Sequence, residues 1–462
     1  MNILNALQAA LPANAFRDTS GYLQEPRGRW QGQAAAVVAP ETVDEVAAVL
    51  RLASDTATPI VPYGGGTGLV GGQLLPDGPA PILLSLERMR AIRAMDAQAG
   101  TMVVEAGAIL ADIHAAAEAE GWVFPLTLAS QGSARIGGLL ATNAGGVNVI
   151  RYGNTRDLVL GIEAVLADGT IVNTLSPLRK NNMGYDLRHL LIGSEGTLGV
   201  ITAASLRLHP MPAQTGAALL VVPSPEAALD LLRLAQAEIG EGVSAFELIG
   251  KMGFDFLAEV GPDVRVPFDP APEWCCLIDL GLSHGDPATA LEALFAKAHG
   301  AGLASDGVIA QSDADRRDLW AIRENIPEAN RRIGSISSHD ISVPVGAIPH
   351  FIAEAPGRLA QINTFRINCF GHMGDGNLHY NVFPIPGHSR SDHESERAAI
   401  KACVHDLTHE LGGSISAEHG IGRLKVEDLE RYGDPGKLAA MRAIKAALDP
   451  KNILNPGAVL RG

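Results

Sequence analysis

Cysteine is scarce in this chain of 462 residues, which has four cysteines and no C-x-x-C pair. This excludes a c-type haem and an iron–sulfur cluster, because both need closely spaced cysteines. Cys275, Cys276, Cys369 and Cys403 are instead expected to be buried free thiols. Such thiols are typical of a reducing compartment, so we expect a cytoplasmic protein.

Long apolar runs and early basic residues are also missing. No stretch reaches the roughly eighteen apolar residues of a transmembrane helix, so we expect no membrane span. No lysine or arginine precedes Arg17, which argues against a secretory signal peptide. The net charge of −15 argues against nucleic-acid binding, which depends on clustered basic residues.

The apolar residues that are present, 47% of the chain, suffice for two or three domains. Short strand-like runs alternate with amphipathic stretches at first, and longer helical stretches dominate from about residue 215. We therefore expect an α+β protein. Its first domain covers residues 1–212, with an N-terminal helix over residues 1–30 packing on it. A second domain covers 213–420, and a helical segment, 421–462, returns to the first domain.

A glycine-rich loop, "VPYGGGTGLVGG", follows an expected strand at residues 61–72. From Gly66 onward it satisfies G-x-G-x-x-G, the fingerprint of a Rossmann dinucleotide site. That site needs a long helix directly after the loop, yet Pro76 and Pro79 stop any helix within two turns. The match is therefore accidental, and we expect no NAD site here.

The same loop remains suited to binding an anion. Four glycines in five positions, beginning at Gly64, let several backbone N–H groups point at one ligand. A second glycine-rich segment, residues 129–146, adds backbone donors and the side chains of Thr142 and Asn143. Two separated loops of this kind suit a pyrophosphate held by backbone amides.

Two histidines, His372 and His379, flank a glycine-rich loop in "FGHMGDGNLHYNV". The glycines forbid a helix, so we expect a hairpin with residues 373–378 in its loop and both imidazoles at its mouth. Such a pair makes half of a divalent-metal site. Downstream, Glu418 and His419 are adjacent and point opposite ways on extended backbone. We expect Glu418 to complete the metal triad and His419 to act as a base. Zinc suits this ligand set, with manganese or iron as alternatives.

Seven motifs together carry a family resemblance: "PYGGGTGL", "GSARIGGLLATNAGG", "RYGNTRD", "IGSEGTLGVIT", "FGHMGDGNLHYNV", "AEHGIGRLK" and "NPGAVL". Over residues 35–460 the chain resembles the FAD-linked oxidoreductases of the vanillyl-alcohol-oxidase type. It is most similar to their D-2-hydroxyacid dehydrogenase branch, which includes D-lactate and D-2-hydroxyglutarate dehydrogenases. The resemblance implies a PCMH-type FAD-binding domain, an α+β substrate domain and the metal and base assignment given above.

The resemblance also implies how FAD is held. In this family the two glycine segments bind the pyrophosphate and adenosine, the Gly199–Ile201 backbone follows the adenine side, and Asn455 comes near the isoalloxazine. No histidine lies between Pro62 and Gly72, so we expect non-covalent FAD. The implied FAD-binding residues are Pro62, Gly64, Gly65, Gly66, Thr67, Gly68, Leu69, Gln131, Gly132, Ser133, Gly137, Gly138, Thr142, Asn143, Gly145, Gly146, Glu195, Gly199, Val200, Ile201 and Asn455.

The implied reaction is oxidation of a D-2-hydroxy acid, in which the Cα hydride moves to flavin N5. A divalent ion lowers the pKa of the substrate hydroxyl, and His419 takes the proton. Arg323 stands at the family position that reaches the substrate carboxylate. Asn377 is expected to contact the substrate oxygens, whereas Asp375 shapes the turn.

The chain departs from the 2-hydroxyglutarate enzymes at two positions. Pro327 and Ser338 stand where a Thr and a Lys are expected. A buried distal carboxylate without a cationic partner costs about 3–5 kcal/mol. The cations that could replace the lysine are Lys425, Arg423 and His339. D-2-hydroxyglutarate is therefore the first candidate substrate, followed by D-lactate, D-malate or another D-2-hydroxy acid.

The electron acceptor must be separate, because the sequence has no NAD, haem or iron–sulfur motif. The resemblance suggests an electron-transfer flavoprotein or a quinone, and amphipathic helices could support a homodimer. Two other functions would each use only part of these motifs. A metal hydrolase would use the two histidines and Glu418 but leaves both glycine loops unexplained. A regulatory nucleotide-binding protein would need no base.

Overall fold

The computed structural model describes residues 2–461 and divides into two compact units. The first unit holds the residues up to Gly146, Gly153–Met211 and those from Glu418 onward. The second holds Val147–Tyr152 and Pro212–Ala417. The segment 421–462 therefore lies in the first unit. Among the described residues, no helix is both long and apolar enough to cross a membrane.

The first unit contains a small sheet and a larger antiparallel one. In the small sheet, of order β1-β2-β4-β3, both β2 and β3 run parallel to β4. The larger sheet has the order β5-β6-β10-β8-β9. The strands are β1 (Phe16–Arg17), β2 (Ala36–Val38), β3 (Ile60–Tyr63), β4 (Ile82–Ser85), β5 (Ile92–Asp96), β6 (Thr101–Glu105), β7 (Trp122–Val123), β8 (Val159–Val165), β9 (Ile171–Asn173), β10 (Val200–Arg207) and β11 (His209–Pro210).

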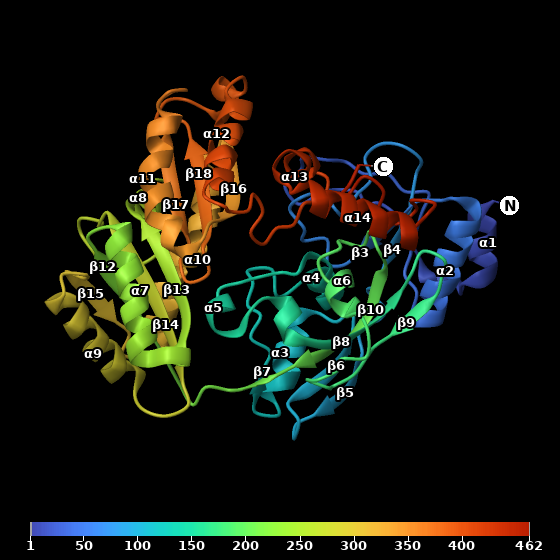
Figure 1. The fold of residues 1–462 in the computed structure, drawn as a ribbon, viewed down its shortest axis with the longest axis horizontal. Coiled ribbons are helices and arrows are strands. Elements are labelled where there is room, and N and C mark those ends of the chain that lie inside the picture. The colour runs from blue at the N-terminus through green and yellow to red at the C-terminus, as the bar shows by residue number, and fades with distance from the viewer. Residues whose placement is uncertain (1, 462) are drawn as a thin grey trace. The chain divides into compact units, whose positions relative to one another are not determined.

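Short helices surround these sheets. α2 connects β2 to β3 and begins where the Thr42 hydroxyl accepts from the Glu45 N–H. Its apolar face joins a core with Leu7 of α1, and Figure 1 shows these two helices side by side. The helices are α1 (Ile3–Ala10), α2 (Val43–Thr56), α3 (Leu110–Glu118), α4 (Ile136–Thr142), α6 (Leu187–Leu191), α13 (Val426–Tyr432) and α14 (Pro435–Leu448).

The N-terminal helix is much shorter than the expected span of 1–30. It ends at Ala10, and Leu11 is already extended, with φ −116° and ψ 149°. The next residue is Pro12, whose ring disfavours a helical conformation for the residue before it.

The second unit is built on one seven-stranded antiparallel sheet of order β15-β12-β14-β13-β17-β18-β16. Its strands are β12 (Gln214–Val222), β13 (Val243–Gly250), β14 (Trp274–Leu282), β15 (Asp306–Ile309), β16 (Ser337–Ser342), β17 (Arg366–His372) and β18 (Asn377–Phe383). Its helices are α5 (Val149–Tyr152), α7 (Pro225–Ile239), α8 (Lys251–Val260), α9 (Pro287–Gly300), α10 (Asp313–Ile333), α11 (Ile348–Leu359) and α12 (Arg397–Glu410).

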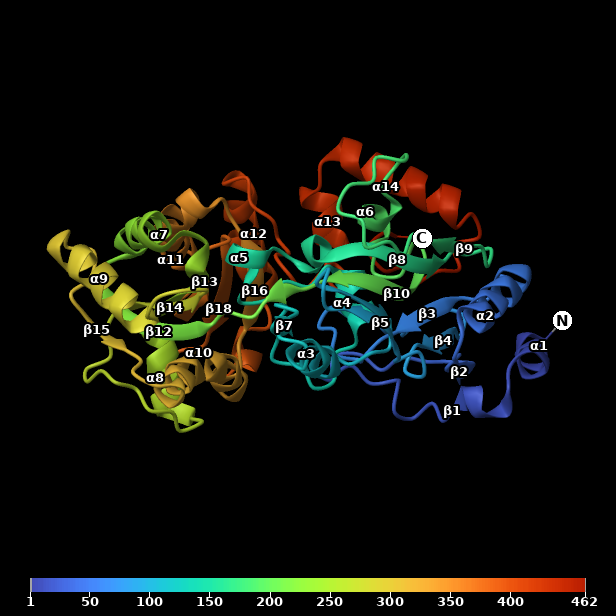
Figure 2. The ribbon, with the colours of Figure 1, turned by 90° about the horizontal axis from the view of Figure 1, so that it is seen from below.

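Helices cover both faces of this sheet. α7, α9, α11 and α12 form a large apolar core with one face. α8 and α10 cover the other face, as Figure 2 shows. Successive residues of a strand point to opposite faces, so a polar residue in these buried strands lies against a defined set of helices.

The C-terminal segment is fastened to β3 by backbone hydrogen bonds and by one buried carboxylate. Ile60 donates to Ile453 O at 2.8 Å, and Asn455 donates back to Ile60 O at 2.8 Å. Asp449 accepts from the Ile453 and Leu454 N–H groups, at 3.0 and 2.7 Å, and from Lys445 Nζ at 2.5 Å. Asp449 therefore fixes the turn that places Asn455.

Replacing Asp449 by alanine removes these contacts and leaves Lys445 without its carboxylate. We expect the free energy of unfolding to fall by about 3 kcal/mol, because a partly buried cation loses its partner. The measurement is the thermal unfolding transition followed by circular dichroism. Asp434→Ala is the matched control, because Asp434 is an exposed N-cap on the same helix and costs about 1 kcal/mol. Equal shifts for both variants would contradict the special role of Asp449.

Candidate active site

The first unit contains a pocket of about 140 Å³ between its two glycine segments. Its walls come from the loop after β3, from α4, from the residues before and at the start of β10, and from His419. The predicted FAD-binding residues that line it are Pro62, Gly64, Gly65, Gly66, Thr67, Gly68, Gly137, Gly138, Thr142, Glu195, Gly199, Val200 and Ile201. Those that do not line it are Leu69, Gln131, Gly132, Ser133, Asn143, Gly145, Gly146 and Asn455.

The two glycine segments touch through their backbones. A Cβ added at Gly65 would lie 2.3 Å from Ser133 O, and one at Gly64 would lie 3.3 Å from the Gly138 Cα. Side chains at these positions would push the segments apart and fill the pocket. The pocket therefore has walls of exposed backbone, which suit a phosphate-containing cofactor better than a purely apolar ligand.

Residues that sequence reasoning missed also line this pocket, among them Tyr63, Gln73, Arg135 and Ser194. Arg135 had a visible signal, because it is the one basic residue within the second glycine segment of an acidic chain. Its Nη1 donates to Gly107 O at 2.7 Å, which holds the guanidinium beside the pocket.

Glu195 and Asn455 brace the loop that carries His419. The Glu195 carboxylate accepts from the Ile421 and Gly422 N–H groups at 2.7 and 2.8 Å. Burial raises the pKa of Glu195, while these two donors favour its charged form. Asn455 Nδ2 donates to Gly72 O at 2.9 Å and to Glu195 O at 2.8 Å. These contacts hold the glycine loop and residues 421–422 together.

In the second unit, β17 and β18 form the expected hairpin, but its loop is shorter than residues 373–378. Asn377 already belongs to β18, where it pairs with Ser342 of β16. The Asp375 carboxylate accepts from the Asn377 N–H at 3.1 Å, so Asp375 shapes the turn. His379 consequently lies opposite Phe370, two positions from the mouth. The His372 and His379 ring centroids are nevertheless 5.3 Å apart.

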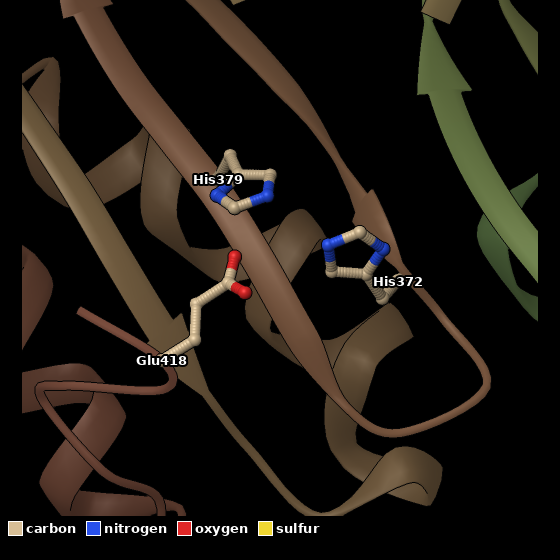
Figure 3. Close-up of side chains that lie close together, drawn as sticks. All are labelled: His372, His379 and Glu418. Atoms are coloured by element: carbon tan, nitrogen blue, oxygen red, sulfur yellow. The ribbon is translucent and has the colours of Figure 1, made fainter. Parts of the chain in front are cut away.

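Glu418 points at these two imidazoles (Figure 3). The boundary between the units falls at the peptide bond before Glu418, and the preceding Ala417 N–H donates to Asp340 O at 3.2 Å. One ligand atom from each of His372, His379 and Glu418 lies within 4.8 Å of the others. Two histidines and one carboxylate are a donor set that zinc takes in catalytic sites, so these residues fit a divalent metal.

Asp340 adds a second carboxylate beside this cluster. One ligand atom from each of Asp340, Glu418 and His419 also lies within 4.8 Å of the others. Asp340 Oδ1 lies 3.8 Å from His379 Nδ1 and accepts from Asn377 Nδ2 at 2.9 Å. Asn377 also donates to Ile341 O at 2.9 Å, so its amide nitrogen is committed to β16. Two nearby carboxylates favour a cation between them.

Glu247, which sequence reasoning missed, lies behind His372. Its two oxygens accept from His372 Nδ1 and Arg323 Nε, each at 2.6 Å. Burial raises the pKa of Glu247, but the interactions with His372 and Arg323 outweigh burial and lower the pKa to about 2. The signal was present in "VSAFELIG", where Glu247 is the one charged residue of a fully buried strand.

Arg323 and two of the candidate substitute cations occupy defined places. The Arg323 guanidinium lies 4.7 Å over the Phe370 ring and is almost fully buried. Arg423 donates to Gly71 O, Gly72 O, Asn455 Oδ1 and Pro456 O, so it fastens the glycine loop. His339 packs against His405, on the opposite face of β16 from Asp340. The guanidinium of Arg423 is thus engaged by the glycine loop, and the ring of His339 is engaged by His405.

Two family models together match most of the chain. The family model "FAD binding domain" matches residues 34–175, and "FAD linked oxidases, C-terminal domain" matches residues 211–459. The fold is similar to that of a crystal structure of p-cresol methylhydroxylase with substrate bound. The TM-score is 0.75 at 15% identity, over 99% of this chain and 96% of the other.

Two curated relatives are similar over nearly the whole chain. D-2-hydroxyglutarate dehydrogenase of Xanthomonas citri pv. viticola is 37% identical over 98% of this chain and 95% of its own length. The mitochondrial D-2-hydroxyglutarate dehydrogenase of Bos taurus is 37% identical over 98% of this chain and 82% of its own length.

The fold and the pocket thus define a flavoprotein of the vanillyl-alcohol-oxidase type, which confirms the expected α+β class. Within that class, the chain belongs to the family of FAD-dependent D-2-hydroxyacid dehydrogenases. A metal hydrolase and a regulatory nucleotide-binding protein are thereby set aside.

The contact between the glycine segments predicts the effect of one added methyl group. Gly65→Ala places a Cβ against Ser133 O, so the segments must separate and FAD retention should fall strongly. The measurement is the flavin absorbance per polypeptide after purification. Gly132→Ala is the matched control, because a Cβ there meets nothing within 4 Å. Full FAD occupancy in Gly65→Ala would contradict the account of the pocket.

Proposed function

We propose that this protein oxidises D-2-hydroxyglutarate to 2-oxoglutarate with non-covalent FAD and a divalent metal. Zinc is the first candidate for this metal. His372, His379 and Glu418 hold the metal, His419 is the base, and Arg323 binds the substrate carboxylate. Bound FAD supplies a hydride acceptor. A bound metal supplies a Lewis acid that orients the hydroxy acid and lowers the pKa of its hydroxyl group.

The adjacency of Glu418 and His419 carries this proposal. His419 lines the FAD pocket, and Glu418 belongs to the His372–His379 cluster. Consecutive Cα atoms are about 3.8 Å apart, so the chain itself joins the pocket wall to the metal ligands. A base is needed where the substrate loses its proton, and a cation is needed where the hydroxyl is acidified. His419 is this base, and the neighbouring residue Glu418 is one of the ligands that hold the cation.

The remaining residues orient the substrate. Among the described residues, the Arg323 side chain makes one hydrogen bond, from Nε to Glu247, which leaves its two terminal nitrogens for a carboxylate. During the reaction, the imidazole of His419 takes the hydroxyl proton while the hydride leaves Cα and a C=O bond forms. Asn377 fixes Asp340 beside His379 and thereby supports the site.

Relatives named D-2-hydroxyglutarate dehydrogenase support the choice of substrate. Pro327 and Ser338 weaken it, since Ser338 is exposed and hydrogen-bonded to Ser335. Lys425, which is buried, is the remaining candidate partner for a distal carboxylate. A D-2-hydroxy acid with a shorter side chain, such as D-lactate or D-malate, is the second candidate.

We further infer that the reduced flavin passes its electrons to a separate electron-transfer flavoprotein or quinone, in a cytoplasmic enzyme that forms homodimers. The sequence carries no motif for a second redox group, which supports an external acceptor. Four free cysteines support a reducing compartment.

The substrate assignment is tested by steady-state kinetics with an artificial electron acceptor. We expect kcat/KM for D-2-hydroxyglutarate to exceed that for D-lactate and D-malate at least about tenfold, because a site that pairs a distal carboxylate rejects substrates without one. The L-isomer serves as the control and should be inactive. A higher kcat/KM for D-lactate would move the assignment to the second candidate.

The division of labour between Glu418 and His419 predicts different defects in two neighbouring variants. His419→Gln removes the base, so kcat should fall by about 10²- to 10⁴-fold while FAD and metal content stay unchanged. Glu418→Gln should lose metal and keep FAD, because only the ligand set is changed. Elemental analysis and flavin absorbance separate the two defects. Loss of metal in His419→Gln alone would reverse the assignment.

A further inference from the structure

The second unit contains a fully buried carboxylate, that of Glu247, which contacts both His372 and Arg323. Glu247 lies on β13, where every residue is buried and its own side chain is 0% exposed. It pairs in register with His372 of β17, so both side chains lie on the same face of the sheet. A buried charge of this kind persists only when its partners compensate for lost hydration.

Both oxygens of Glu247 are used, and they serve different residues. Oε1 accepts from His372 Nδ1 at 2.6 Å, and Oε2 accepts from Arg323 Nε at 2.6 Å. An ionised carboxylate cannot donate, so the proton of a neutral His372 lies on Nδ1. The lone pair of the ring then lies on Nε2, and a neutral imidazole binds a metal through the nitrogen that carries its lone pair.

The same carboxylate fixes the head of Arg323. With Nε held by Glu247, the guanidinium plane lies 4.7 Å over the Phe370 ring. Phe370 contacts the ring of His379 at a centroid distance of 5.0 Å, and His379 contacts His372 at 5.3 Å. These contacts form a closed circuit of five side chains on one face of the sheet.

We propose that Glu247 is a positioning residue that sets two groups at once: the tautomer of the metal ligand His372, and the orientation of Arg323 toward the substrate carboxylate. This inference rests on the proposed function of the same site. It assigns Glu247 no contact with substrate or cofactor. Glu247 acts by coupling the metal ligand to the substrate-binding arginine through one carboxylate group.

Glutamine is the informative replacement because it keeps the size of the side chain and removes one acceptor. Its amide offers one oxygen and one NH₂ group, whereas His372 Nδ1–H and Arg323 Nε–H are both donors. In either orientation of the amide, one donor faces another donor. If the oxygen turns to Arg323, His372 must shift its proton to Nε2 and can no longer bind metal through that nitrogen.

A matched control lies on the neighbouring strand. Asp279 of β14 is also buried and clamps the same helix, α10, through Arg316 Nε at 2.7 Å and Trp320 Nε1 at 2.7 Å. Among the described residues, all three hydrogen bonds of its side chain go to α10, and none goes to the histidine pair. Asp279→Asn therefore reproduces the loss of a buried carboxylate–arginine clamp without changing His372.

The experiment measures zinc affinity of the FAD-loaded protein by competition with a chromophoric chelator. We expect Glu247→Gln to bind zinc about 10- to 100-fold more weakly than the unchanged protein, and Asp279→Asn to stay within about threefold. The KM for D-2-hydroxyglutarate should rise in Glu247→Gln, because Arg323 loses its anchor. Unfolding temperatures of both variants show that the comparison is made between folded proteins.

Unchanged zinc affinity in Glu247→Gln, or equal weakening in Asp279→Asn, would overturn the positioning role. Should Glu247→Gln not fold, Glu247→Asp keeps the charge on a shorter side chain that cannot span both donors. It should also bind zinc more weakly, and unchanged affinity would count against the proposal. His372→Ala tests the proposed function separately. If it binds zinc as tightly as the unchanged protein, the metal assignment fails and this inference fails with it.

Discussion

The peptide bond between Glu418 and His419 is the constraint on which the site depends. Glu418 forms a cluster with His372 and His379, which lie on the seven-stranded sheet, and His419 lines the FAD pocket. Because their Cα atoms are about 3.8 Å apart, neither group can move far without the other. Both ends of this dipeptide are held: Ala417 bonds to Asp340, and Ile421 and Gly422 bond to Glu195. The Glu418–His419 dipeptide is thus fixed by hydrogen bonds on either side.

Three buried carboxylates near this dipeptide hold neighbouring groups in place. Glu195, Glu247 and Asp449 each accept two or more hydrogen bonds, and each fixes a loop or a side chain next to the site. An unpaired buried carboxylate would be costly, so these groups are tied to the geometry that surrounds them.

Much of this could be predicted from the sequence. The glycine segments, the two histidines and the Glu418–His419 pair are local motifs, and their residue types restrict the chemistry on their own. The N-terminal helix is shorter than its amphipathic pattern predicts, because Pro12 disfavours a helical conformation at Leu11. The loop of the β17–β18 hairpin is shorter than the sequence predicts. Asn377 pairs with Ser342 of β16, a strand that is distant in the sequence.

Glu247 shows most clearly which part of the site could not be predicted from the sequence. Its place beside His372 comes from the pairing of β13 with β17, two strands more than a hundred residues apart, and no local pattern encodes that register. The same holds for Arg323 of α10, whose anchor Glu247 is on β13, and for His339, whose side chain faces away from Asp340 because of strand alternation. Motifs identify the groups that react, whereas non-local pairing decides which groups position them.

The central claim is that the flavin and the metal serve one substrate at one site. The most direct measurement is the rate of flavin bleaching when D-2-hydroxyglutarate is mixed anaerobically with protein stripped of metal, and again after zinc is restored. The account predicts slow or absent bleaching without metal and rapid bleaching with it, at unchanged FAD content. Equal rates in both states would contradict it, because the histidine cluster would then have no part in hydride transfer.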